Sequence, residues 1–227
     1  FDNNAPNHVS AFLGDLGRDL PEKEQIYWKS FNLVPEDRKI SRANFERSFL
    51  GNVFDAENPE HIFKQNFKRL QDYWKNKYGW SLFLPLDKKD EHFFNSLRSM
   101  LTKEQSEFDG QILALTKSTI DSINVKSLRE YLKVTDPSIK SIGLMELLLT
   151  ALQSRNLTEQ VSLIRGIQSI RSTGVAHRKG TDYEKIISKL NIDDNDFQNE
   201  FDHLLLNMAL LFKGIMQLDA KKSDMLP

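Results

Sequence analysis

Apolar residues recur along this chain at spacings of three and four, and this helical periodicity constrains the fold more than any other feature. One segment shows it from start to stop: Asn58-Pro59-Glu60 is a cap followed by proline at the first helical position, and Gly79 is a stop signal. Strand-like alternation is scarce, and only 7 Pro and 10 Gly are dispersed over the 227 residues. The sequence therefore predicts an all-α protein.

The remaining elements follow from cap residues and apolar spacing. The sequence predicts helices from Pro21 to about Asn32, from Ser41 along Phe45, Phe49 and Val53, from Asn58 to Gly79, from Asp87 to Met100, from a Thr102-x-x-Gln105 capping box to Ile123, from Asp136-Pro137 through Leu152, from Thr158 to about Ser172, from Tyr183 to Leu190, and along Leu204 to Met216. Between Trp80 and Leu86 a helix cannot continue through Pro85, so this segment is expected to be a packed connector.

Two of the predicted helices, 143–152 and 204–216, are apolar on nearly every side, as expected of helices at the centre of a bundle. We therefore expect residues 102–227 to form a bundle of four or five helices. Residues 1–101 form a smaller packed helical region without an assigned function. No flexible linker separates the two regions, and the boundary is placed near residue 101.

Composition excludes several classes of protein. The chain has no cysteine, which removes thiolate metal sites and disulfides and favours a cytoplasmic location. No apolar stretch reaches the roughly 20 residues of a membrane-spanning helix. The five histidines form no paired metal-binding motif, so neither a metal nor another cofactor is expected. Because the chain starts at Phe1 without methionine, we expect it to belong to a longer protein with further domains.

The net charge of −1 gives no general affinity for nucleic acid, but basic residues concentrate in one region. Residues 161–189 contain six basic side chains against two acidic ones, and residues 190–212 contain five acidic side chains and no basic one. Positive potential should therefore gather in the first of these segments. One interpretation is a phosphate-binding surface, and the other is an ordinary solvated helix face.

Within the basic segment, Arg171 is followed by five residues and then His177, at the end of a predicted amphipathic helix. This arrangement, with the Ala-His-Arg-Lys-Gly ending at 176–180, resembles the Arg-x(4–6)-His signature of HEPN domains. The resemblance covers about ten residues in motif and residues 102–220 in helical pattern. It implies a helical bundle that forms a homodimer, with two motifs in one cleft, and a metal-independent RNase or RNA-binding effector in bacterial antiphage or stress defence.

The resemblance also assigns roles to residues. Arg171 and His177 would be the catalytic pair, with Ser172 beside them where family nucleases often carry Asn, Asp or His. The chemistry is coherent, because an imidazole can accept the proton of a ribose 2′-OH while a guanidinium stabilises charge on the phosphate. Four further cations are expected to bind the RNA backbone: Arg165, Arg178, Lys179 and Lys185.

An alternative interpretation assigns no catalysis to the chain. Here Arg171 and His177 hold a helix-to-loop turn, and the chain is a non-catalytic interaction or dimerisation module of a larger protein. Two other features are interpreted structurally: the acidic group of Asp87, Asp90, Glu91 and His92 as favourable charges at a helix start, and the aromatic stripe from Phe63 to Tyr78 as core. The segment from Leu13 to Ser30 resembles one that recurs in uncharacterised bacterial proteins, without an implied function.

Overall fold

A computed structural model describes residue 11 and residues 13–33, 58–175, 180–190 and 192–224, and the structural statements below concern these residues. They form ten α-helices and one π-helical turn, without a strand, so the predicted all-α class is confirmed. The contacts divide the chain into two compact units, Phe1–Asp55 and Ala56–Pro227, and each is described by itself.

The first unit contains two short helices, α1 (Leu13–Asp19) and α2 (Glu22–Lys29). Pro21, expected as the first helical residue, is the N-cap of α2, and the helix ends three residues earlier than expected, where the Ser30 hydroxyl donates to the Tyr27 carbonyl at 2.6 Å. No residue of α2 is buried. The helix predicted from Ser41 along Phe45, Phe49 and Val53 lies outside the described residues.

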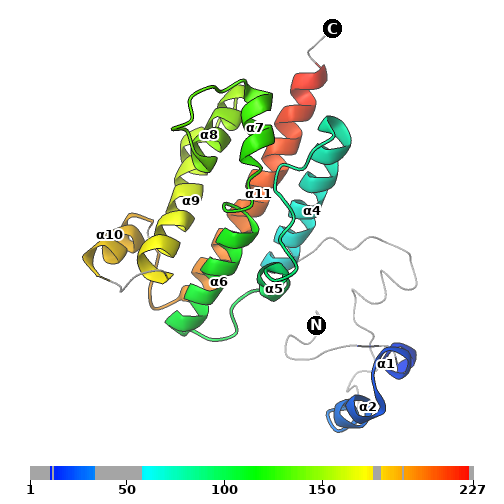
Figure 1. Cartoon of the computed structure of the whole chain (residues 1–227). Helices are drawn as coiled ribbons and strands as arrows, with labels where there is room; N and C mark the ends of the chain where they lie inside the picture. Colours follow the sequence, from blue (N-terminus) through cyan, green and yellow to red (C-terminus); the bar gives the residue numbers. More distant parts are fainter. Residues whose placement is uncertain (1–10, 12, 34–57, 176–179, 191, 225–227) are drawn as a thin grey trace. The chain divides into compact units, whose positions relative to one another are not determined.

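The second unit is a helical bundle (Figure 1). Its elements are α4 (Pro59–Tyr78), α5 (Glu91–Ser96), α6 (Gln105–Ser118), α7 (Val125–Leu132), α8 (Ser141–Ala151), α9 (Leu157–Ile170), a π-helical turn η1 (Arg171–Val175), α10 (Thr181–Lys189) and α11 (Phe197–Asp224). The long helix α11 packs along α4 and also contacts α6 and α9. None of the helices in the described part of the chain has the length and hydropathy that crossing a bilayer requires.

Helix α4 matches its prediction at both ends. Pro59 is its first residue, and Gly79 follows with a φ of +78°, in the left-handed region that L side chains rarely adopt. The predicted aromatic stripe is core: Phe63 and Trp74 are fully buried, and the Phe63 ring lies 5.6 Å from the ring of Phe212 on α11. Since α4 packs on α11, the boundary expected near residue 101 falls inside the second unit.

A buried carboxylate near the C-terminal end of α11 forms hydrogen bonds with side chains of α4. Asp219 is 1% exposed, and it accepts hydrogen bonds from the hydroxyls of Tyr78 at 2.6 Å and Tyr73 at 2.9 Å and from the Lys77 ammonium at 2.6 Å. Burial lowers the pKa of Lys77, but the contacts with Asp219 and Tyr73 outweigh it and leave that pKa above its usual value. Burial and the neighbouring Asp219 also raise the pKa of Tyr78, so the phenol keeps its donor proton.

The segment after Gly79 is a packed connector, as predicted. Leu82 and Phe83 are buried, and the side-chain amide of Gln71 on α4 holds both backbone groups of Phe83, donating at 2.6 Å and accepting at 3.1 Å. Phe83 also forms an isolated antiparallel bridge with Ile123, the residue at which helix α6 was expected to end. That helix stops at Ser118 instead, and Ile123 belongs to the buried turn that follows.

The start of α6 differs from the predicted capping box. The helix begins at Gln105 with Glu104 as its N-cap, and Thr102 bonds Glu107 instead of capping the first turn. The Glu107 carboxylate accepts from the backbone N–H groups of Leu101 and Thr102, from the Thr102 hydroxyl and from Arg98. The sequence suggested a capping box in which Thr102 and Gln105 each bond the other's backbone N–H. In the structure the Glu107 carboxylate instead bonds the loop that precedes the helix.

Helix α7 was not predicted, and α8 begins later than expected. Asn124 caps α7 by accepting from the Ser127 N–H at 3.1 Å. Asp136-Pro137 does not start α8, because the Asp136 carboxylate accepts from the Ser138 N–H at 2.8 Å and closes a local turn. The helix starts at Ser141, and its apolar run is largely buried, as expected for a central position.

The left-handed backbone at Gly79 predicts a measurable cost for a side chain. Gly79→Ala should lower the free energy of unfolding by about 1–2 kcal/mol, because Ala disfavours a φ of +78° although nothing crowds its Cβ. Gly110→Ala is the matched control, since Gly110 is exposed within α6 and Ala there should raise stability by up to about 1 kcal/mol. Urea unfolding of both variants checks this, and equal effects would contradict it.

The environment of Glu107 predicts that the stability of the fold depends on pH. Partial burial opposes ionisation, but the bonds from Thr102, the Leu101 N–H and Arg98 outweigh it and lower the pKa of Glu107 from 4.5 to about 2. A pKa below the unfolded value stabilises the fold fully above pH 4.5, and this contribution disappears as the pH falls from 4.5 to about 2.

The variant Glu107→Gln isolates this contribution. At pH 7 it should lower the free energy of unfolding by roughly 1–3 kcal/mol, and the difference from wild type should shrink as the pH is lowered below 4.5. Urea unfolding at pH 7, 5, 4 and 3 measures it. A difference that stays constant with pH would contradict the assignment to the ionised carboxylate.

Candidate functional site

The motif predicted to carry chemistry lies where α9 changes its helical type. The α-helix ends at Ile170, and Arg171–Val175 continue it as one π-helical turn, η1, which packs against α6. The hydroxyls of Ser172 and Thr173 both donate to the Ser169 carbonyl, at 3.0 and 2.7 Å. These side-chain bonds accompany the widened turn, and single π turns are frequent at functional sites.

Arg171 is the first residue of this turn, and its side chain is 30% exposed, so solvent reaches it. Its Nη2 lies 3.6 Å from the Oδ2 of Asp121, in the turn that follows α6. This separation exceeds the 2.7–2.9 Å typical of a charge-assisted hydrogen bond, so the pair is an ionic contact rather than a bidentate clamp. Arg171 is therefore placed at the surface between α9 and the end of α6, with a carboxylate nearby.

The other half of the predicted catalytic pair is not placed. His177 and the predicted RNA-binding residues Arg178 and Lys179 lie outside the described residues, between Val175 and Gly180. Ser172 is placed, and its hydroxyl is used by the Ser169 carbonyl. The prediction that Arg171 and His177 form one site thus stays a prediction.

Two further predicted RNA-binding residues are placed, and both have acidic neighbours. Arg165, on α9, forms an ion pair with Glu146 on α8 at 2.6 Å, and its side chain is 60% exposed. Lys185, on α10, lies 3.2 Å from Asp182 one turn earlier in the same helix. With Arg171 beside Asp121, each of the three described cations has a carboxylate partner, which weakens the positive potential expected from the sequence.

The acidic group predicted to lie at a helix start is found at the beginning of the short helix α5. Asp90 is the N-cap of α5 and Glu91 its first residue, as the charge preference of a helix start predicts. The His92 ring lies 2.8 Å from the Lys89 carbonyl. In the part of the chain that the structure describes, no three His, Asp or Glu side chains are close enough together to hold a metal ion.

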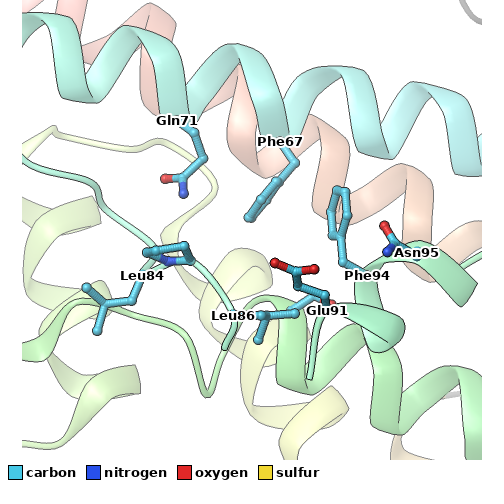
Figure 2. A pocket seen from close by; sticks show the side chains of 9 residues that line it. Phe67, Gln71, Leu84, Leu86, Glu91, Phe94 and Asn95 are labelled. Carbon is cyan, nitrogen blue, oxygen red and sulfur yellow. The ribbon is translucent and has the colours of Figure 1, made fainter. Parts of the chain in front are cut away.

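A pocket that the sequence did not predict lies between α4, the connector and α5 (Figure 2). It has a volume of about 340 Å³, and its apolar walls come from Phe67 of α4, Phe94 of α5 and the connector residues 84–86. Four polar residues also line it: Gln71, Glu91, Asn95 and Ser118. In Figure 2 the Glu91 carboxylate lies among the side chains of Phe67, Phe94 and Leu86.

The sequence held partial signals for this pocket. The aromatic stripe was interpreted as core, and Phe67 is only partly buried because it also faces the pocket. Glu91 was interpreted as a helix-start charge, which its position confirms, yet the same residue lines the pocket. The sequence did not predict the conformation of the connector. Leu84 and Pro85 line the pocket because the bond from Gln71 holds the neighbouring Phe83 in place.

Comparisons of the chain with models of known protein families, with curated proteins and with solved structures found no match.

The 3.6 Å separation of Arg171 and Asp121 predicts that this ion pair contributes little to the stability of the fold. Asp121→Asn should change the free energy of unfolding by less than about 1 kcal/mol, because both side chains are about one-third exposed and their charges are screened. Glu146→Gln, which removes the exposed partner of Arg165, is the matched control and should be equally mild. Thermal unfolding of both variants measures this. A loss above about 2 kcal/mol for Asp121→Asn alone would mean that the pair mainly holds the turn.

Proposed function

We propose that the chain is a metal-independent RNase or RNA-binding effector of the HEPN type, in which Arg171 and His177 act on the RNA backbone. The observation that carries the proposal is the position of Arg171. It is the first residue of a π-helical turn that ends α9, it is reachable by solvent, and His177 follows six residues later. A rare turn type directly before the histidine supports a functional role for this segment.

The proposed chemistry needs two groups. The neutral imidazole of His177 accepts the proton of a ribose 2′-OH, whose oxygen then attacks the adjacent phosphorus. The bond from phosphorus to the 5′-oxygen breaks, the leaving 5′-oxygen takes up a proton from water to become a hydroxyl, and the other product carries a 2′,3′-cyclic phosphate. The guanidinium of Arg171 stabilises the charge that develops on the phosphate oxygens. No step uses a metal ion.

Asp121 would compete with RNA for Arg171 in this mechanism. At 3.6 Å the carboxylate neutralises the guanidinium without a close hydrogen bond, so a phosphate can displace it at small cost. Arg178, Lys179, Arg165 and Lys185 would hold the flanking backbone by charge, which makes binding weaken as salt rises. Arg165 and Lys185 would likewise exchange an exposed carboxylate partner for a phosphate.

Two parts of the proposal rest on the HEPN resemblance. The chain would form a homodimer with two Arg171–His177 pairs in one cleft. It would act in bacterial antiphage or stress defence. Sedimentation of the chain at micromolar concentration tests the dimer, and a mass of one chain contradicts the shared cleft.

A second function is favoured by a separate observation. The three described cations of the proposed RNA surface each have a carboxylate partner. This pairing suits an interaction or dimerisation module, in which Arg171 serves the turn after α9 and no RNA is bound. The same experiment separates the two functions.

The test is cleavage of a mixed RNA pool by the full chain in the presence of EDTA. Wild type should produce 2′,3′-cyclic phosphate ends, and His177→Ala should lower the rate at least about 100-fold. Arg171→Lys keeps the charge but loses the planar fork, so it should also cleave more slowly. The matched controls are His203→Ala and Arg69→Lys, which change an exposed histidine on α11 and an exposed arginine on α4.

Two results would contradict the nuclease. Cleavage that persists in His177→Ala would assign the activity to other residues or to a contaminant. Absence of both RNA cleavage and RNA binding by folded wild type would favour the interaction module.

A further inference from the structure

The pocket between α4, the connector and α5 has the composition of a small-molecule site. Its volume of about 340 Å³ is within the range of ligand pockets, and its walls are aromatic and aliphatic with a few polar groups. The Phe67 and Phe94 rings lie 5.3 Å apart at an angle of 40°, so they pack on each other and form one aromatic wall. A flat ligand can stack on this wall but cannot enter between the rings.

Three of the polar groups in the pocket have no partner among the described residues. Ser118 is 2% exposed, and its buried hydroxyl makes no hydrogen bond. The carboxylate of Glu91 and the amide of Asn95 also make no hydrogen bond or ion pair within the described residues. A buried hydroxyl without a partner is unusual. Because the Ser118 oxygen is itself inaccessible to solvent, the groups open to a ligand are those of Glu91 and Asn95.

The remaining polar group is already engaged. The Gln71 amide donates one hydrogen bond to the backbone of Phe83 and accepts another from it, so it shapes the pocket and leaves recognition to Glu91 and Asn95. Glu91 and Asn95 are four residues apart on α5 and therefore lie on the same helix face. They offer a paired acceptor and an amide that both donates and accepts, beside an aromatic wall.

We propose that this pocket binds a guanine base. Guanine is flat, and its Watson–Crick edge carries two adjacent N–H donors, which match the two acceptor oxygens of the Glu91 carboxylate. Its O6 and N7 can accept from the Asn95 amide. Adenine and cytosine each place a ring acceptor beside their amino group, and that lone pair would be repelled by the carboxylate.

The surroundings fit a base that carries a phosphate. Lys64, on α4, has its ammonium 5.9 Å from the centroid of the Phe94 ring, so a cation lies at the aromatic wall. The same recognition suits a free guanine nucleotide and an unstacked guanine in single-stranded RNA. None of the pocket residues belongs to the Arg171–His177 motif, so the proposal does not depend on the proposed cleavage.

The experiment titrates guanosine and adenosine into the full wild-type chain and follows binding by ligand-observed NMR and calorimetry. Guanosine should bind at least about tenfold more tightly than adenosine. Glu91→Gln removes the charge and one acceptor from an exposed position, so it should preserve the fold and weaken guanosine binding at least about tenfold. Glu104→Gln, which changes the exposed N-cap residue of α6 outside the pocket, is the matched control and should bind as wild type does.

A second arm separates the sources of the base. Single-stranded hexanucleotides with one guanine or with none are titrated in the same way. Binding of guanosine itself supports a free nucleoside or nucleotide, and binding only of the guanine-containing hexanucleotide supports an RNA base. Whichever ligand binds the wild-type chain, its binding must be lost in the Glu91→Gln variant.

Four results would overturn the proposal. The first is an absence of guanosine and guanine-hexanucleotide binding at millimolar ligand. The second is equal affinity for guanosine and adenosine. The third is unchanged guanosine binding in Glu91→Gln. The fourth is preferential binding of benzamidine over guanosine, which would assign the pocket to organic cations attracted by Glu91 and the aromatic wall. Because none of these readouts involves His177, they are independent of the outcome of the cleavage test.

Discussion

The packing of α4 against α11 is the constraint on which the second unit depends. These helices begin 138 residues apart in the sequence, at Pro59 and Phe197, and they enclose the fully buried rings of Phe63 and Phe212. At their far end the carboxylate of Asp219 is 1% exposed and is compensated by donors from Tyr73, Lys77 and Tyr78. A buried charge is tolerated only with such partners, so this network fixes the register of the two helices.

The packing of α4 against α11 positions the residues of both candidate sites. The pocket takes Phe67 and Gln71 from α4, and the Phe67 ring is itself held 5.5 Å from Phe212 of α11. The π-helical turn that carries Arg171 packs on α6, which in turn packs on α11. Asp121, the carboxylate beside Arg171, follows Ser118 by three residues, so the end of α6 contributes to both sites.

Local signals made parts of the fold predictable from sequence. The cap before Pro59 and the left-handed Gly79 bound α4 correctly, because both signals act on neighbouring residues. The start of α6 was predicted wrongly, because Thr102 bonds the carboxylate of Glu107. Helix α7 was missed although its Asn124 cap is local, because the preceding helix was expected to continue to Ile123. The boundary near residue 101 was placed from apolar content, which does not reveal that α4 packs on α11.

The same limit applies to the sites. The position of Arg171 at the end of α9 was predictable from helix periodicity, but its neighbour Asp121 lies 50 residues earlier in the chain. The pocket joins residues from α4, the connector, α5 and the end of α6, and only the folded connector brings them together. Long-range pairing, rather than local propensity, therefore decides which side chains can act on a ligand.

We infer from this packing that α4 belongs to the same cooperative unit as α6, α9 and α11. Native-state hydrogen exchange measures it, because the slowest amides of each helix report the free energy of the opening that exposes them. If these helices open together, the slowest amides around Leu70 and Trp74 in α4 exchange with the same free energy as those around Ile112 in α6 and Leu205 in α11. Distinctly weaker protection of α4 than of α6 and α11 would show that α4 opens separately. That result would support the domain boundary near residue 101 that the sequence predicted.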